Sequence, residues 1–93
     1  MIRSFRCKET EGIWQGQPSR KFPGNIQDRV LRKLRQLNAA GTLEDLRNPP
    51  GNRLEGLKGN RAGQMSIRIN DQWRICFRWV AGDAEDVEIA DYH

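Results

Sequence analysis

The sequence predicts an α+β fold, in which two N-terminal helices pack on one face of a mostly antiparallel β-sheet. In the first half of the chain, apolar residues recur with the period of a helix, whereas in the second half they alternate with polar residues. The chain has 93 residues, no internal repeat and no low-complexity segment, which is typical of one small domain with one core. We therefore expect residues 1–93 to form a single domain.

The first predicted elements are a short strand and a short helix. Residues 2–7 are predicted to form the strand. The helix is predicted to begin at Thr10 and carries Ile13 and Trp14. Gly16 follows, and a glycine after an apolar stretch of this kind marks the end of an element.

The longest predicted helix begins at about Asn25, and Gly41 is its expected C-cap. Its apolar residues recur at spacings of four, four and three, which places them on one helix face, and they are Ile26, Val30, Leu34 and Leu37. The basic and polar residues of the other face are Arg29, Arg32, Lys33 and Gln36. A basic outer face is most often simply solvated, so this face by itself indicates no function.

The second half of the chain predicts a β-hairpin that follows an irregular segment. Residues 47–53 are dense in turn-forming residues and are expected to form a loop, and a short strand or turn at 54–58 comes next. Residues 65–69 and 73–79 then alternate between apolar and polar residues, which predicts two paired strands. A three-residue loop at 70–72 makes one face of this pair wholly apolar, whereas a two-residue loop would mix the two faces.

The three-residue loop has a consequence for the charges on the polar face of the hairpin. It places Arg68 directly opposite Arg74, with Arg78 further along the same face. Like charges across a strand pair are destabilising, so a sheet face that carries them is either open to water or shaped to bind an anion. We expect replacement of Arg74 by Ala to leave the fold intact, because it relieves this repulsion.

A final strand is predicted at residues 87–90, and it delivers Asp91, Tyr92 and His93 to the sheet. His93 is the only histidine and Tyr92 the only tyrosine in the chain. Histidine has the side-chain pKa closest to neutral pH and is the usual proton-transfer group. Chain ends are commonly frayed, so the alternative is that both rings only cap a strand. Strict alternation puts Tyr92 and His93 on opposite faces, so one site can use both only if the strand ends or bends near Ala90.

The composition favours a soluble protein with a polyanionic partner. The formal net charge of +4 suits nucleic acid. Cys7 and Cys76 lie far apart, and with a single histidine they cannot form a zinc site, so no metal and no cofactor are expected. Residues 1–6 lack the apolar stretch of a signal peptide, and no segment approaches the roughly 18 apolar residues of a membrane span. We therefore expect a cytoplasmic protein without a membrane partner.

Several residues match what metal-free RNA cleavage requires. A base must take the proton from the ribose 2′-OH, cations must stabilise the charge on the phosphorane, and an acid must protonate the leaving 5′-oxygen. Glu55 is the candidate base and His93 the candidate acid. Lys58 and Arg74 are the candidate cations, and Tyr92 could stack on a base or donate to the phosphate. The residues alone leave open a non-catalytic RNA-binding module, which would use the same basic face.

Several stretches of the chain resemble the HigB toxins, which belong to the RelE/ParE superfamily of type II toxin–antitoxin systems. They are residues 52–61, 66–68, 73–77 and the terminal 91–93, and the opening residues 1–5 are also similar. The resemblance covers nearly the whole chain and implies the RelE-like microbial RNase fold. It implies a ribosome-dependent mRNA interferase that cleaves message in the A site. It also implies a HigA-type antitoxin with a helix-turn-helix domain, and binding to operator DNA only through that antitoxin.

The resemblance also implies the residues of the active site. The positions that match the catalytic residues of the family are Lys58, Arg74, Asp91, Tyr92 and His93. Glu55 stands where some HigB proteins have a histidine, while toxins that resemble YoeB pair a glutamate with a C-terminal histidine, so its role as the base stays open. The candidate RNA-binding residues are Arg53, Arg61, Arg68, Gln72 and Arg78, of which Gln72 matches a position near the mRNA bases.

A second class of toxin shares the expected fold. ParE-type toxins inhibit gyrase by binding protein, and their chains are expected to lack the combination of Arg74 with Tyr92 and His93. The presence of that combination favours the interferase. The hairpin register also puts Trp73 and Trp79 on the apolar face, so we expect these tryptophans in the core rather than as stacking platforms for RNA.

Overall fold

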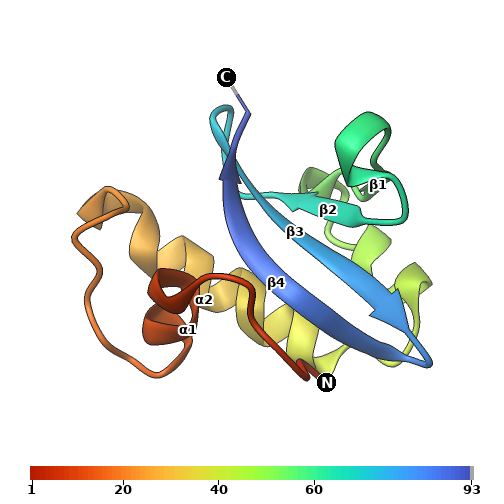
Figure 1. The fold of residues 1–93 in the computed structure, drawn as a ribbon, viewed down its shortest axis with the longest axis horizontal. Coiled ribbons are helices and arrows are strands. Elements are labelled where there is room, and N and C mark those ends of the chain that lie inside the picture. Colours follow the sequence, from red (N-terminus) through yellow and green to blue (C-terminus); the bar gives the residue numbers. More distant parts are fainter. Residues whose placement is uncertain (93) are drawn as a thin grey trace.

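In the computed structural model, which describes residues 1–92, helices cover one face of a twisted antiparallel sheet (Figure 1). The helices are α1 (Lys8–Trp14) and α2 (Gly24–Ala39), and the short 3₁₀ turns are η1 (Leu43–Arg47), η2 (Pro50–Asn52) and η3 (Gly59–Arg61). The strands lie side by side in chain order and are β1 (Glu55–Gly56), β2 (Met65–Arg68), β3 (Trp73–Val80) and β4 (Asp83–Asp91). Each neighbouring pair is antiparallel. The predicted α+β fold is confirmed.

The hydrophobic core lies between α2 and the face of the sheet that the helices cover. Val30, Leu34 and Leu37 are completely buried, as the spacing of the apolar residues in α2 predicts. Ile67 and Ile75 are completely buried on the facing side of the sheet. Burial of each side chain of this kind contributes about 1.5–3 kcal/mol to folding, so this one layer of contacts holds α2 on the sheet.

The hairpin of β2 and β3 has the predicted register. Ile67 pairs with Ile75, and Arg68 pairs with Arg74. In the connecting turn, the side-chain oxygen of Asn70 accepts two backbone N–H bonds, at 2.9 and 2.8 Å. These local hydrogen bonds close the turn and hold the register that keeps the apolar face on the core.

Both tryptophans of β3 pack against the core, as predicted. Trp73 meets Phe22 edge-on, with ring centroids 5.5 Å apart and an angle of 87° between the ring planes. Trp79 meets Phe77 at 6.4 Å and 71°. Edge-to-face pairs of this kind are favourable in protein cores. The tryptophans are therefore engaged with the protein and do not form a platform for RNA bases.

The prediction of a strand at residues 2–7 is wrong. This segment makes isolated parallel bridges that join Ile2 and Phe5 to β4. Between the two bridges, Asp86 has a left-handed backbone with φ of 53°, and its N–H donates to the hydroxyl of Ser4 at 2.9 Å. A bulge of this kind leaves one residue out of the ladder, so the backbone pairing of the N-terminal segment is interrupted.

The ends of the helices differ from the prediction by one or two residues, because hydrogen bonding is weakest there. The first helix begins at Lys8 rather than at Thr10. Ala40 rather than Gly41 is the C-cap of α2. Within residues 1–92, no helix is long and apolar enough to cross a membrane.

The last strand is longer than predicted. It runs over Asp83–Asp91 rather than over residues 87–90. The turn before it consists of Ala81 and Gly82, whose φ angles of 52° and 85° are both left-handed. Two such residues form the tight turn that best matches the twist of paired strands. The two strands therefore pair directly after the turn, at Val80 and Asp83, and β4 runs beside β3 as far as Trp73 and Asp91.

Candidate active site

The face of the sheet opposite the helices carries the predicted site. Ser66 on β2, Arg74 and Cys76 on β3, and Glu88 on β4 alternate in sequence with the core residues and so point to this open face. Arg74 is only 9% exposed, which is unusual for an arginine on a sheet face without a covering helix. Its burial indicates that neighbouring groups of the protein enclose the guanidinium.

Three oxygen atoms hold the Arg74 guanidinium. Its Nε donates to the hydroxyl of Ser66 at 2.8 Å, and its Nη2 donates to the backbone oxygen of Arg53 at 2.7 Å. The same Nη2 lies 3.3 Å from Oε1 of Glu55, whose side chain is 56% exposed. The two neutral acceptors orient the guanidinium without removing its charge. A cation fixed in this way needs no reorganisation when an anion binds.

The loop before β1 positions two of these acceptors, the carbonyl of Arg53 and the carboxylate of Glu55. Asn52 is completely buried, and its Nδ2 donates to two backbone carbonyls of the preceding segment at 3.1 and 3.4 Å. Arg53 follows it with a left-handed backbone, φ 44°, which turns its carbonyl toward Arg74. The loop predicted at residues 47–53 is therefore anchored by a buried amide, and it places Glu55 beside the guanidinium.

Tyr92 lies on the other side of Arg74. The Cζ atom of Arg74 is 6.0 Å from the centre of the Tyr92 ring, which is within reach of a cation–π interaction. The N–H of Tyr92 donates to the backbone oxygen of Gln72 at 2.6 Å, and the side chain of Gln72 donates to Asp91 at 3.2 Å. β4 thus stays paired with β3 as far as Asp91, and ordinary alternation is enough to put Tyr92 on the open face. His93 lies outside the described residues.

The Tyr92 hydroxyl is a hydrogen-bond donor at neutral pH. The thiol of Cys76 donates to it across 3.8 Å. Burial, and then the contact with Cys76, raise the pKa of Tyr92. Burial also raises the pKa of the Cys76 thiol. Because Tyr92 remains 40% exposed, a bound phosphate can reach a protonated phenol here.

Two further arginines border the open face. Arg61 Nη1 and Arg6 Nε lie 3.4 and 3.6 Å from the same oxygen of Glu88. These side chains line a shallow cavity of about 340 Å³ together with Asn60. Two cations share one carboxylate, so this rim keeps a net positive charge that suits a polyanion.

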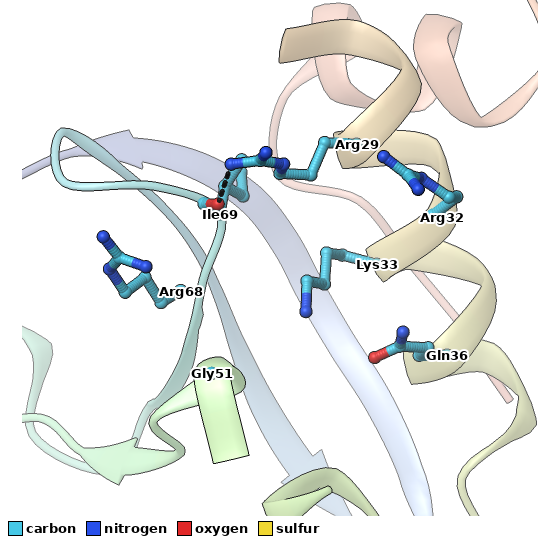
Figure 2. A pocket seen from close by; sticks show the side chains of 7 residues that line it. All are labelled: Arg29, Arg32, Lys33, Gln36, Gly51, Arg68 and Ile69. Atoms are coloured by element: carbon cyan, nitrogen blue, oxygen red, sulfur yellow. Dashed lines mark hydrogen bonds between the residues drawn. The ribbon is translucent and has the colours of Figure 1, made fainter. Parts of the chain in front are cut away.

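Three other predicted cations are Arg68, Lys58 and Arg78. Arg68 forms an ion pair with Asp71 and lines a cavity beside α2 (Figure 2). The predicted pairing of Arg68 with Arg74 across the strands is confirmed, and each guanidinium also has partners of its own. Lys58 is exposed in the turn after β1, and Arg78 is exposed on β3.

Comparison with known proteins decides the family. Residues 3–93 match a family described as "RelE-like toxin of type II toxin-antitoxin system HigB". The chain belongs to this HigB-like family. Toxin HigB-1 of Vibrio cholerae is 51% identical to it over 85 residues, which cover 90% of each chain. Endoribonuclease HigB of Proteus vulgaris is 32% identical over 93 residues, which cover all of both chains.

Solved structures share the fold of this HigB-like toxin at low sequence identity. A YoeB/ParE toxin from Agrobacterium tumefaciens matches all of both chains with a TM-score of 0.58 and 17% identity. The toxin–antitoxin complex YoeB-YefM from Staphylococcus aureus matches with a TM-score of 0.57 and 16% identity, over 100% of this chain and 98% of that one. These likenesses confirm the RelE-like fold. As a member of a toxin–antitoxin family, the chain has an antitoxin as its partner.

Several residues of the open face of this HigB-like toxin are not among the site residues predicted from the sequence. Ser66 and Cys76 are direct partners across β2 and β3, and the predicted register could have identified both. Glu88 could have been placed by alternation along the last strand. Arg6 could not, because it reaches the site through parallel bridges between distant segments of the chain.

Proposed function

We propose that this chain is a ribosome-dependent endoribonuclease, which cleaves mRNA in the A site by metal-free attack of the ribose 2′-OH. The preorganised guanidinium of Arg74, with Glu55 on one side and Tyr92 on the other, is the observation that carries the proposal. The relative from Proteus vulgaris bears the name of an endoribonuclease, which supports the same activity.

The proposed reaction is one in-line displacement. Glu55 takes the 2′-OH proton, and O2′ forms a bond to the adjacent phosphorus. Arg74 and Lys58 stabilise the charge of the phosphorane, and Tyr92 donates to a non-bridging oxygen. The bond from phosphorus to O5′ then breaks as His93 gives its proton to O5′. The products are a 2′,3′-cyclic phosphate and a 5′-hydroxyl.

Asp91 and Gln72 are proposed to position this machinery. Their side chains hydrogen-bond each other at 3.2 Å, and the Gln72 backbone accepts the N–H of Tyr92. These two hydrogen bonds join Gln72, just before β3, to Asp91 and Tyr92, so they hold Tyr92 at this end of the sheet. Loss of either side chain is expected to disturb the placement of Tyr92 rather than the chemistry itself.

The remaining proposed contacts are to the RNA backbone and bases. Arg53, Arg61 and Arg78 surround the open face and supply positive charge, while Arg68 lies beside α2. Gln72 has a half-buried side chain near the chain end, where a base of the message can reach it. Phosphate contacts of this kind position a strand without reading its sequence.

The antitoxin is proposed to be of the HigA type. In this proposal it carries a helix-turn-helix domain, and the toxin reaches operator DNA only through it. The ribosome and its mRNA are the other partners, and they place the toxin in the cytoplasm. No membrane partner is part of the proposal.

The first test is ribosome dependence. We expect a defined mRNA on programmed ribosomes to be cut within codons about 10²-fold faster than the same RNA free in solution, because the ribosome orients the strand. Primer extension locates the cuts and single-turnover kinetics give the rates. Binding is expected to weaken steeply with salt, since neutralised phosphates release counterions.

Equal cleavage rates on free and ribosome-bound RNA would contradict this proposal. A chemical step that requires a divalent metal would contradict it as well. Inhibition of gyrase without RNA cleavage would instead identify a ParE-type toxin. Binding of RNA without any cleavage on ribosomes would leave only a binding module.

A second test concerns the hydroxyl that orients Arg74. Ser66→Ala is expected to slow cleavage by roughly tenfold, because a misplaced guanidinium meets the phosphorane in poorer geometry. It is also expected to lower the free energy of unfolding by about 1.5–3 kcal/mol, the usual contribution of a hydrogen bond to a charged group. Single-turnover cleavage and urea unfolding measure the two effects.

Ser4→Ala is the matched control for this test. It removes the hydroxyl that accepts the N–H of Asp86, which is four positions along β4 from Ala90, the partner of Arg74. Some loss of stability with unchanged cleavage is expected for this control. If Ser66→Ala also leaves the cleavage rate unchanged, Ser66 supports the fold alone.

A further inference from the structure

A second concentration of positive charge lies beside α2, in a cavity of about 330 Å³ (Figure 2). We call it the α2 cavity, and the residues that line it are Arg29, Arg32, Lys33, Gln36, Gly51, Arg68 and Ile69. Four of these seven residues are arginine or lysine, and none of the seven is acidic. The cations come from two elements, since α2 contributes three of them and Arg68 borders the cavity from the end of β2.

Lys33 is held in the α2 cavity by a neutral partner. Its ammonium donates to the side-chain oxygen of Asn52. Asn52 is completely buried, and its Nδ2 donates to Gln36 at 3.3 Å and to a backbone carbonyl of the preceding segment at 3.1 Å. The amide therefore fixes the position of the ammonium but leaves its charge uncompensated.

Arg29 is also held by a neutral partner. Its Nη1 donates to the backbone oxygen of Ile69 at 3.2 Å, which directs the guanidinium toward the hairpin (Figure 2). Arg68 has a carboxylate partner, Asp71, but the side chain of Asp71 is fully exposed, so water screens this pair strongly. Neutral or exposed partners thus set the geometry of the cations, while their charges remain available.

Concentrating like charges in this way costs free energy. Burial, and then the nearby Arg29, Arg32 and Arg68, lower the pKa of Lys33. A basic outer face of α2 that was merely solvated would spread its charges, and the sequence pattern alone suggests that outcome. In the structure, three of the basic residues of α2 instead line one cavity together with Arg68. Its volume is at the small end of the range of ligand sites, which is about 300–1,000 Å³.

We propose that the α2 cavity is a second phosphate-binding site, which holds one backbone phosphate of folded RNA. Planar guanidinium forks matched with an ammonium point charge are the donor set that phosphate oxygens prefer. The cavity also adjoins the candidate active site, because Arg68 is the strand partner of Arg74 and Gly51 lies two positions before Arg53. One folded RNA can therefore contact both places.

Phosphate binding by the cavity stands independently of cleavage, whereas the assignment to RNA rests on the proposed function. The first experiment titrates inorganic phosphate into the ¹⁵N-labelled protein at constant ionic strength. Saturable shifts are expected at the backbone amides of Gly51, Ile69 and Lys33. In the double variant Arg32→Gln/Lys33→Gln, the affinity is expected to fall roughly tenfold, because charge-assisted hydrogen bonds to the phosphate are removed.

The matched control is the double variant Arg20→Gln/Arg35→Gln. Both arginines are exposed and outside the cavity lining, so this control loses the same net charge. Its phosphate affinity is expected to stay close to that of the wild type. Arg29→Gln/Arg32→Gln, which replaces two exposed side chains, is the second cavity variant if replacement of Lys33 prevents folding.

The second experiment identifies the source of the phosphate. Binding of a 2′-O-methylated RNA hairpin, which cannot be cleaved, is measured against salt concentration. When a protein neutralises one phosphate fewer on a duplex, the slope of log K against log salt becomes shallower by about 0.9. We expect that decrease in the cavity variants, and a smaller one in the control.

Several results would overturn the proposal. Phosphate shifts that do not saturate, or equal losses of affinity in the cavity and control variants, would show only general attraction to positive charge. Phosphate binding with an unchanged RNA salt slope would assign the cavity to a free phosphate ligand. A loss of antitoxin affinity with unchanged RNA binding would assign it to an acidic segment of the antitoxin. Absence of cleavage on ribosomes, with both binding results as expected, would refute the proposed function and leave the phosphate site standing.

Discussion

Replacing His93 with Gln is expected to slow single-turnover cleavage on programmed ribosomes by about 10²–10⁴-fold, the usual contribution of a general acid. Gln keeps much of the size and hydrogen bonding of histidine but has no titratable proton. In the wild type, the rate is expected to fall at high pH, because the acid must be protonated. That basic limb of the pH–rate profile is expected to be missing from the variant.

Companion variants separate the roles of the neighbouring groups. Tyr92→Phe removes only the hydroxyl. A large loss of rate would show that the hydroxyl transfers a proton or binds the phosphate, and a small loss would leave the ring only a stacking role. Glu55→Gln is expected to match the effect of His93→Gln if the two act as base and acid. Cleavage by His93→Gln at nearly the wild-type rate would refute the catalytic role of the terminus and reduce it to the cap of a strand.

Replacing Arg74 with Ala is expected to slow cleavage by about 10²–10³-fold, because one preorganised donor to the transition-state charge is removed. The structure reverses the expectation for stability. Relief of the cross-strand repulsion from Arg68 contributes at most about 1 kcal/mol. The Ser66 hydroxyl and the Arg53 carbonyl instead lose their donor. We expect the free energy of unfolding to fall by about 1–3 kcal/mol.

Arg74→Lys is the informative comparison for this prediction. It keeps the charge but cannot donate to Ser66 and Arg53 in the geometry of a planar fork. A large loss of cleavage in this variant, measured with its unfolding in urea, would show that orientation matters beyond charge. Full activity of Arg74→Ala on ribosomes, with the fold retained, would remove Arg74 from the proposed mechanism.

Patterns with a short period were sufficient to predict most of the fold. The four, four and three spacing from Ile26 to Leu37 predicts the buried face of α2, and alternation predicts the pairing of Ile67 with Ile75. Both patterns depend on one requirement, that apolar side chains leave water on the same side of an element. The strand expected at residues 2–7 failed because its ladder depends on a bulge in a strand some 80 residues away.

The sequence by itself determined the α+β architecture, the register of the hairpin and the residue types on its open face. These properties follow from local periodicity and from the chemistry of side chains. Only the tertiary structure decided which charges act together. Arg68 and Arg74 are equivalent in the register, yet one borders the α2 cavity and the other is held by Ser66 and Arg53. The physical reason is that long cationic side chains take the direction their hydrogen-bond acceptors impose, and those acceptors come from segments that only folding brings near.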